Sequence, residues 1–170
     1  MSRLKFIKTR DVKSPTRAND TDSWIDMYVP NDLDSIKETP TEDNDTVIEL
    51  DEELNCFYIN PWKGLLIPTW IKTIIEPWFD LVFENKSWVS VKYGLVIGAK
   101  VVDSSYRGEI HIHVINTSDE VQYIEPWQKL AQAILRKVEL DIPEEITEEE
   151  FEAQNNTNRW SWGFWSTWEQ

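Results

Sequence analysis

The chain contains a single cysteine, Cys56, so no intramolecular disulfide can form, and this usage fits a reducing cytoplasm. No apolar run approaches the roughly 20 residues that a membrane helix requires, and there is no signal-peptide pattern. We therefore expect no membrane partner and a cytoplasmic location, which is the host cytoplasm for a viral protein. At 170 residues, with 41% apolar and 28% charged side chains, the chain suits one globular domain.

Positive charge is also scarce, since 17 basic residues face 31 acidic ones and the net charge is -14. Such a balance excludes general affinity for the phosphate backbone of nucleic acids, and we expect no nucleic-acid partner. A small anionic substrate would require a divalent cation or a local concentration of positive charge. Lys86, Lys92, Arg107 and Arg159 are the candidate cations.

Glycine is the third shortage, because the chain has five glycines and ten tryptophans. Soluble domains show the reverse, with glycine among their commonest residues. Glycine normally occupies backbone positions with positive φ and positions where the backbone approaches a ligand closely. The excess of tryptophan over glycine therefore requires a cause specific to this chain.

Short apolar or alternating runs separated by turn residues predict an all-β domain. The clearest is 109–115, where Ile110, Ile112 and Val114 alternate with polar neighbours. Residues 130–135 suit a strand buried on both faces, with a helix as the alternative, and residues 86–92 suit one or two helical turns. Further strands are expected at 4–7, 25–29, 47–50, 56–59, 64–68, 71–75, 79–83, 93–97, 101–102 and 121–124.

Composition divides the chain into three regions. Residues 1–140 form the expected β domain, with an acidic surface insertion at 31–53. Residues 141–158 are typical of an acidic linker or extended arm. Residues 159–170 are too aromatic for a free tail, so we expect this segment to dock.

The turn at 103–108 joins two predicted strands and carries an acid, a phenol and a guanidinium. Asp103 directly follows the strand at 101–102, so the sheet can aim its carboxylate outward, where it could orient a water molecule. The alternative is an Asx-turn, in which the carboxylate accepts hydrogen bonds from backbone N–H groups of its own turn.

Five segments resemble, in the same order, the motifs of the trimeric dUTP diphosphatases. They are SWIDMY at 23–28, NKSWVSVKYGL at 85–95, VVDSSYRGEI at 101–110, IEPWQKLAQAIL at 124–135 and RWSWGFWSTW at 159–168. The fifth resembles the family run Arg-Gly-X-Gly-Gly-Phe-Gly-Ser-Thr-Gly and is highly specific. The resemblance covers nearly the whole chain apart from the insertion at 31–53.

This resemblance implies a distorted jelly-roll (β-clip) fold and a homotrimer whose sites draw motifs from different subunits. It implies Mg²⁺-dependent hydrolysis of dUTP to dUMP and diphosphate, which keeps uracil out of DNA and supplies dUMP for dTMP synthesis. A dCTP deaminase of the same fold is disfavoured, because the Asp-x-x-Tyr-Arg-Gly turn and the Phe-x-Ser-Thr tail resemble the hydrolase branch. The remaining alternative is an inactive nucleotide-binding or regulatory module.

The resemblance assigns Asp103 to the water that attacks the α-phosphorus, a role that suits a positioned carboxylate. Tyr106 would pack against the deoxyribose and exclude a 2′-hydroxyl. Asp26 would lie near the magnesium-triphosphate and act on the metal through water. Without the family, Tyr106 is an ordinary aromatic at a strand end and Asp26 a solvent-facing acid.

Lys86 takes the place of the second motif's arginine, and it supplies charge to the phosphates without a planar fork. Ser87 would donate its hydroxyl to the phosphate chain, or else cap a helix. Gln132 would reach the phosphates with its amide NH₂, or else make a buried structural hydrogen bond.

In the tail, the resemblance implies that Phe164 stacks on uracil. Arg159, Ser166 and Thr167 would bind the terminal phosphates and close a neighbouring subunit's site. His111 and His113, the only histidines, share one face of a strand. Two histidines without further ligands make an incomplete zinc set, so a solvent or subunit-contact face is expected.

Every tryptophan stands where the family motif or local turn chemistry calls for glycine. This indicates a systematic replacement of glycine, through engineering or an incorrect sequence. Indoles in the tail would prevent the close wrap around a triphosphate, which bears directly on activity. The ten positions are Trp24, Trp62, Trp70, Trp78, Trp88, Trp127, Trp160, Trp162, Trp165 and Trp168.

Overall fold

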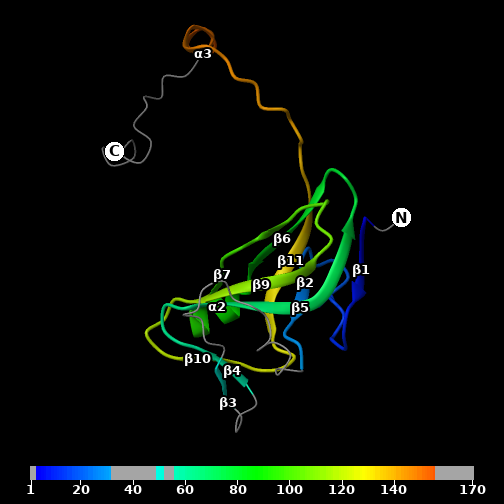
Figure 1. Cartoon of the computed structure of the whole chain (residues 1–170), viewed down its shortest axis with the longest axis vertical. Coiled ribbons are helices and arrows are strands. Elements are labelled where there is room, and N and C mark those ends of the chain that lie inside the picture. The colour runs from blue at the N-terminus through cyan, green and yellow to red at the C-terminus, as the bar shows by residue number, and fades with distance from the viewer. Residues whose placement is uncertain (1–2, 32–48, 52–55, 156–170) are drawn as a thin grey trace. The chain divides into compact units, whose positions relative to one another are not determined.

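The structure, a computed structural model, describes residues 3–31, 49–51 and 56–155, with the backbone alone for 49–51. It divides into two units, residues 1–139 and residues 140–170. The first unit contains β1 (Leu4–Lys8), β2 (Ile25–Tyr28), β3 (Glu49–Asp51), β4 (Cys56–Ile59), β5 (Gly64–Ile75), β6 (Phe79–Asn85), α2 (Ser87–Tyr93), β7 (Leu95–Ile97), β8 (Val101–Val102), β9 (Glu109–Asn116), β10 (Gln122–Ile124) and β11 (Lys129–Lys137) (Figure 1).

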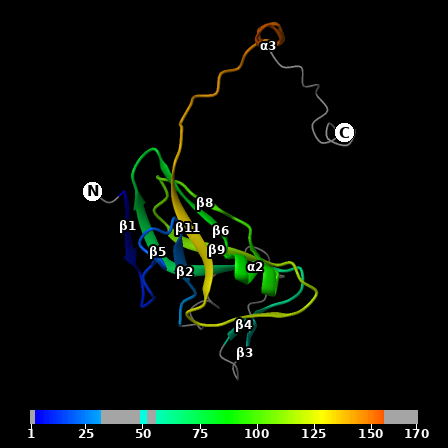
Figure 2. The same cartoon turned by 180° about the vertical axis from the view of Figure 1, so that it is seen from behind.

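The strands of the first unit form three antiparallel sheets, which confirms the predicted all-β class. The strand orders are β1-β5-β9-β7, β10-β4-β3 and β2-β11-β6-β8. Figure 2 shows the third sheet, with β11 lying between β2 and β6. This third sheet matters most for function, because β6 leads directly into α2 and β8 leads into the turn at 103–108.

The core confirms the period-two pattern of β9. Ile110, Ile112 and Val114 are buried, while the alternate residues of the strand stay partly exposed. They pack in one cluster with Ile67 and Ile71 of the neighbouring strand β5. Burying a side chain of this size contributes roughly 1.5–3 kcal/mol each, so this cluster anchors the strand that leaves the 103–108 turn.

Two strand predictions require correction. The runs at 64–68 and 71–75 are one continuous strand, β5, whose register shifts between Pro68 and Lys72 instead of breaking. A bulge accommodates a proline without ending a strand. The run at 93–97 becomes strand only from Leu95, since Tyr93 still belongs to α2. The strand prediction at 130–135 is confirmed by β11, so the helical alternative is wrong.

The second unit contains α3 (Glu148–Gln154), a helix that its acidic composition did not predict. Thr147 accepts a hydrogen bond from the backbone N–H of Glu150, and the Glu150 carboxylate accepts one from the backbone of Thr147. This capping box, a Thr-x-x-Glu signature, was the signal for the helix. No helix in the described residues is long and apolar enough to cross a membrane.

Four tryptophans adopt the left-handed backbone conformation. Trp62, Trp70, Trp78 and Trp127 have φ between 55° and 70°, close to the 65° of Gly94. In the described part of the chain, every non-glycine residue with positive φ is a tryptophan. A bulky residue held at positive φ costs on the order of 1–3 kcal/mol, so the backbone at these four positions is strained by its own side chains.

We expect Trp78→Gly to raise the free energy of unfolding by about 1–3 kcal/mol, because it relieves strain at a side chain that is 54% exposed. The matched control is Trp88→Gly, which lies in α2, where glycine costs roughly 0.5–1 kcal/mol. Urea unfolding of both variants measures the difference. Shifts of the same sign at both positions would contradict the assignment of strain to position 78.

Candidate active site

Asp103 lies directly after β8 at the surface, and its carboxylate has no hydrogen bond or ion pair with any described residue. The turn is closed instead by the backbone, because the N–H of Tyr106 donates to the carbonyl oxygen of Asp103 at 3.1 Å. The Asx-turn alternative is therefore wrong. A backbone-closed turn leaves both carboxylate oxygens available to accept hydrogen bonds from water or a ligand.

The rest of this turn is held by its own side chains. The Tyr106 hydroxyl donates to the carbonyl of Glu109 at 2.8 Å. A Cβ at Gly108 would come within 2.4 Å of that hydroxyl oxygen, so only glycine lets the ring fold back over the turn. Arg107 donates to the carbonyls of Ser104 and Tyr106 at 2.6 and 2.9 Å. Arg107, a candidate phosphate cation, thus serves to fix the turn.

A second group of polar residues forms around Asp26 of β2, which is buried at 6% exposure. Lys86 Nζ donates to its Oδ1, and Lys129 Nζ lies 2.8 Å from its Oδ2. The solvent-facing alternative for Asp26 is therefore wrong. Burial raises the pKa of the Asp26 carboxyl, but hydrogen bonds and positive charge from Lys129 and Lys86 outweigh it and hold the pKa below its usual value.

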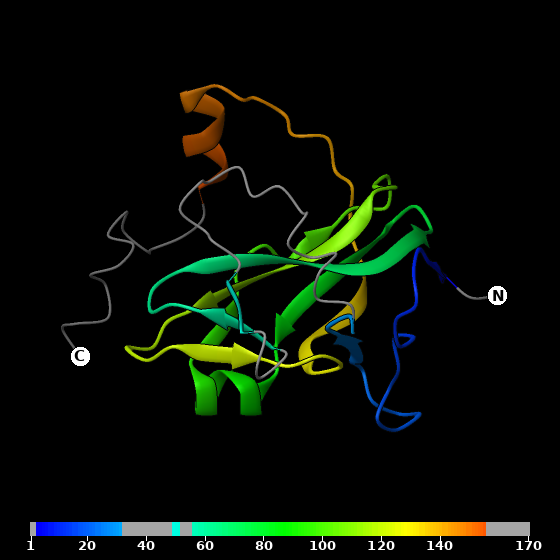
Figure 3. The ribbon, with the colours of Figure 1, turned by 60° about the horizontal axis from the view of Figure 1, so that its bottom comes forward.

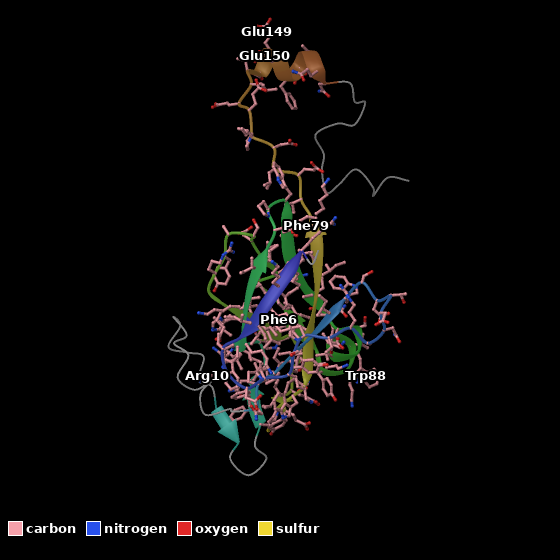
Figure 4. All side chains as sticks on the ribbon, turned by 90° about the vertical axis from the view of Figure 1, so that its right-hand side faces the viewer. Phe6, Arg10, Phe79, Trp88, Glu149 and Glu150 are labelled. Atoms are coloured by element: carbon pink, nitrogen blue, oxygen red, sulfur yellow. The ribbon has the colours of Figure 1, made fainter. Side chains whose placement is uncertain are left out.

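Lys86 and Lys129 also line a pocket of 490 Å³ between α2 and β10, two elements that lie side by side in Figure 3. Trp88 of α2, labelled in Figure 4, lines this pocket, and its side chain is 68% exposed. Lys92 Nζ lies 5.4 Å from the centre of a Trp88 ring. The two ammonium groups make the pocket suited to an anion. The other lining residues are Val89, Tyr93, Gln122, Tyr123, Glu125 and Gln128.

Ser87 is the exposed first residue of α2 and does not cap it. The N-cap is Lys86, and no side chain makes a capping hydrogen bond there. The capping alternative for Ser87 is therefore wrong, and its hydroxyl stays available to a ligand.

Gln132 of β11 links the two strands that carry these groups. It is the register partner of Asp26, and its amide Nε2 donates to the backbone oxygen of Asn85 at 3.0 Å, one residue before Lys86. The structural hydrogen bond proposed as its alternative role is therefore present. The same bond places Gln132 beside the end of β6, next to the lysine.

The predicted site residues thus fall into two groups, joined by β6. Val102 pairs with Leu81, so Asp103 lies near the start of β6, whereas Lys86 follows its end at Asn85. Six residues of strand span roughly 20 Å at about 3.3 Å per residue. Within one chain, the group of Asp103 and Tyr106 is therefore separated from the group of Asp26, Lys86, Ser87 and Gln132 by a distance that no single α-phosphate can bridge.

The remaining predicted site residues do not belong to either group. Arg159, Phe164, Ser166 and Thr167 are outside the described residues. Lys129 was not predicted as a site residue, although the basic position of the fourth motif was the signal for it.

The described residues do not offer a direct magnesium site. No group of three or more His, Cys, Asp and Glu side chains gathers in the part of the chain that the structure describes. Both oxygens of Asp26 already accept from lysines, and His111 Nδ1 lies 3.1 Å from the carbonyl oxygen of Glu109. At the described residues, a divalent cation would therefore need oxygen ligands from elsewhere, such as water or phosphate.

We expect Asp26→Asn to lower the free energy of unfolding by roughly 1–3 kcal/mol at neutral pH, because it leaves two ammonium groups without their carboxylate. The folded-state pKa of Asp26 lies below its unfolded value, so the stabilisation is present above about pH 5 and is lost as pH falls through the folded pKa.

Urea unfolding from neutral to acid pH measures this effect. The variant should show a shallower loss of stability on the acid side than the parent. Glu84→Gln is the control, because Glu84 pairs with Lys100 at the surface, where such pairs contribute about 1 kcal/mol or less. Identical acid profiles for the parent and Asp26→Asn would contradict this account of the pair.

Curated relatives are similar over much of the chain. The deoxyuridine 5′-triphosphate nucleotidohydrolase of Fusobacterium nucleatum is 32% identical over 107 residues, which cover 62% of this chain and 70% of the relative. That of Finegoldia magna is 34% identical over 115 residues, which cover 66% of this chain and 77% of the relative.

Solved structures show the same fold. The dUTPase of EIAV superposes with a TM-score of 0.61 at 21% identity, covering 85% of this chain and 97% of that one. A mutant dUTPase from phage phi11 of S. aureus gives 0.67 at 16% identity, covering 86% and 98%. A model of the family described as dUTPase matches residues 54–168, more than half of the chain, and the protein therefore belongs to the dUTPase family.

Proposed function

We propose that this chain hydrolyses dUTP to dUMP and diphosphate. Its curated relatives are named as nucleotidohydrolases of deoxyuridine triphosphate, which does not favour the inactive-module alternative. The observation that carries the proposal to this chain is the Asp103 carboxylate, exposed on a turn that the backbone closes, with no partner among the described residues. A carboxylate held in this way is suited to orient a water molecule for attack.

In the proposed mechanism, Asp103 accepts a hydrogen bond from the attacking water and draws its proton as the oxygen adds to the α-phosphorus. The bond from the α-phosphorus to the bridging oxygen breaks, and diphosphate leaves. Tyr106 packs against the deoxyribose, and its folded-back ring, fixed by Glu109 and permitted by Gly108, supports a fixed wall there. A fixed wall rejects an extra hydroxyl by steric conflict.

The triphosphate is proposed to lie at the other group of residues. Lys86 and Ser87 supply an ammonium and a hydroxyl, Gln132 holds the end of β6 beside them, and Lys129 adds a second positive charge. Arg159, Ser166 and Thr167 are proposed for the terminal phosphates and Phe164 for the uracil.

Magnesium is proposed to enter with the triphosphate. The phage phi11 structure concerns coordination of a structural Mg(II) ion, which supports a divalent cation in this family. Asp26 is proposed to act on the metal only through water, since its oxygens already accept from two lysines. Charge neutralisation of the phosphates is the chemistry that the ion supplies.

We also propose a homotrimer in which each site combines Asp103 and Tyr106 of one subunit with Lys86 and its neighbours of another. The spacing of the two groups along β6 supports this arrangement, because one chain alone holds them too far apart. The cellular role proposed is to keep uracil out of DNA and to supply dUMP for dTMP synthesis, in the cytoplasm.

Asp103→Asn should lower kcat for diphosphate release from dUTP by about 10²- to 10⁴-fold, the usual contribution of a positioned general base. The assay compares dUTP with dCTP on the purified protein. Asp119→Asn is the control, since Asp119 is another exposed acid in a surface turn. Diphosphate release that is unspecific for dUTP, or equal in Asp103→Asn and the parent, would overturn the proposed function.

Variants of the two groups should complement each other in mixed oligomers. Asp103→Asn and Lys86→Ala are each expected to be nearly inactive alone, whereas unfolding and refolding them together should restore roughly a quarter of the sites by random assortment. Mixing Asp103→Asn with Tyr106→Ala, two changes in one group, should restore none. Absence of recovery in the first mixture would place the whole site within one chain and contradict the shared arrangement.

A further inference from the structure

Four of the tryptophans have a backbone conformation that is typical of glycine. Trp62, Trp70, Trp78 and Trp127 occupy the left-handed region, where a branched or bulky side chain clashes with its own backbone and glycine does not. Asparagine and aspartate are the non-glycine residues that tolerate this region best. Among the described residues, no Asn or Asp residue has positive φ, although four of the six tryptophans do.

The other tryptophans match glycine by motif position. Trp24 and Trp88 stand at the glycine positions of the first two motifs, and four more occupy the glycine positions of the fifth, among residues 159–168. No tryptophan stands anywhere else in the chain. If the source used tryptophan in the ordinary way, some of the ten would occupy core or surface positions unrelated to glycine.

Composition points the same way. The five glycines and the ten tryptophan positions together would give fifteen glycines in 170 residues, near the ordinary glycine content of about 7%. Some described positions that demand glycine do carry it, such as Gly94 at φ 65° and Gly108 under the Tyr106 ring. Glycine is thus kept at some positions and replaced at others with the same backbone conformation, so structural demand alone does not decide which positions are replaced.

We infer that the source cell places glycine at all ten tryptophan positions, because it decodes one codon, UGA, as glycine. UGA ends translation in the standard genetic code, and variant codes assign it to tryptophan or to glycine. Reading a gene of the second kind with a code of the first kind converts each UGA glycine to tryptophan and leaves glycines with GGN codons unchanged. This accounts for the complete replacement, the surviving glycines and the left-handed tryptophans together.

Glycine at these positions changes the chemistry of the site as well as its strain. At position 88 it removes a 68% exposed indole from the pocket that Lys86 and Lys129 line. The same change exposes the backbone N–H of residue 88 beside Ser87. Small residues there allow phosphate oxygens to approach the backbone closely, which an indole prevents.

The indoles do make contacts. Trp70 is buried at 3% exposure below the guanidinium of Arg10, and Trp62 Nε1 donates to Asp119 at 3.1 Å. An indole placed beside a cation or an acid finds such partners, so these contacts do not distinguish a native tryptophan from a misread one. The test must therefore identify the residue directly.

The decisive experiment is peptide mass spectrometry on the protein isolated from its source, together with the codons of its gene. We expect glycine in every peptide that spans one of the ten positions, an intact mass lower by ten indole side chains, and UGA at all ten positions with GGN at the five glycines. Peptides that contain tryptophan at these positions, or UGG codons there, would overturn the inference.

A second measurement compares two complete chains made synthetically, one with tryptophan and one with glycine at all ten positions. The glycine chain should unfold cooperatively at a higher temperature, and the tryptophan chain should be less stable or fail to fold. An equal or higher midpoint for the tryptophan chain would count against the inference. A stable glycine chain without dUTP hydrolysis would remove the proposed function and leave this inference standing.

Discussion

The rigid length of β6 is the constraint on which the site depends. A paired central strand cannot shorten, so it holds the turn that carries Asp103 and the helix that follows Lys86 at its two ends. Neither group holds all the predicted roles alone, because the acid predicted to orient the water, Asp103, lies in one group, whereas Lys86 and Ser87, predicted to bind the phosphates, lie in the other. Symmetric assembly is the simplest way to bring opposite ends of identical strands together, since the same surfaces then meet repeatedly.

The two acids of the site differ through their surroundings. Asp103 stands on a turn whose backbone already makes the closing hydrogen bond, and so its oxygens are available to solvent. Asp26 is buried and shared by two lysines, which fixes the lysines in place and lowers its own pKa. The first arrangement suits a group that must exchange protons, and the second suits one that must stay ionised and position its neighbours.

Much of the fold and of the candidate site could be predicted from the sequence, because the alternation of apolar residues in β9 and the order of the motifs are local sequence patterns. The merging of two runs into β5 could not, since only pairing with β9 decides whether Pro68 ends a strand or sits at a bulge. The helix α3 was missed because charge composition was weighed above the Thr147–Glu150 capping signature. Lys129 was missed because its role depends on which carboxylate β2 brings beside it, a matter of register between distant strands.

Asp26 balances one of the two charges of Lys86 and Lys129, so this ion-paired group carries a net positive charge in a molecule whose net charge is -14. At physiological ionic strength, fields between exposed charges decay over about 8 Å, so the many remote acids are screened while this nearby cation is not. An approaching polyanion is therefore repelled weakly at long range and captured only at short range. Added salt should hasten the first stage of its encounter with the protein and weaken the last.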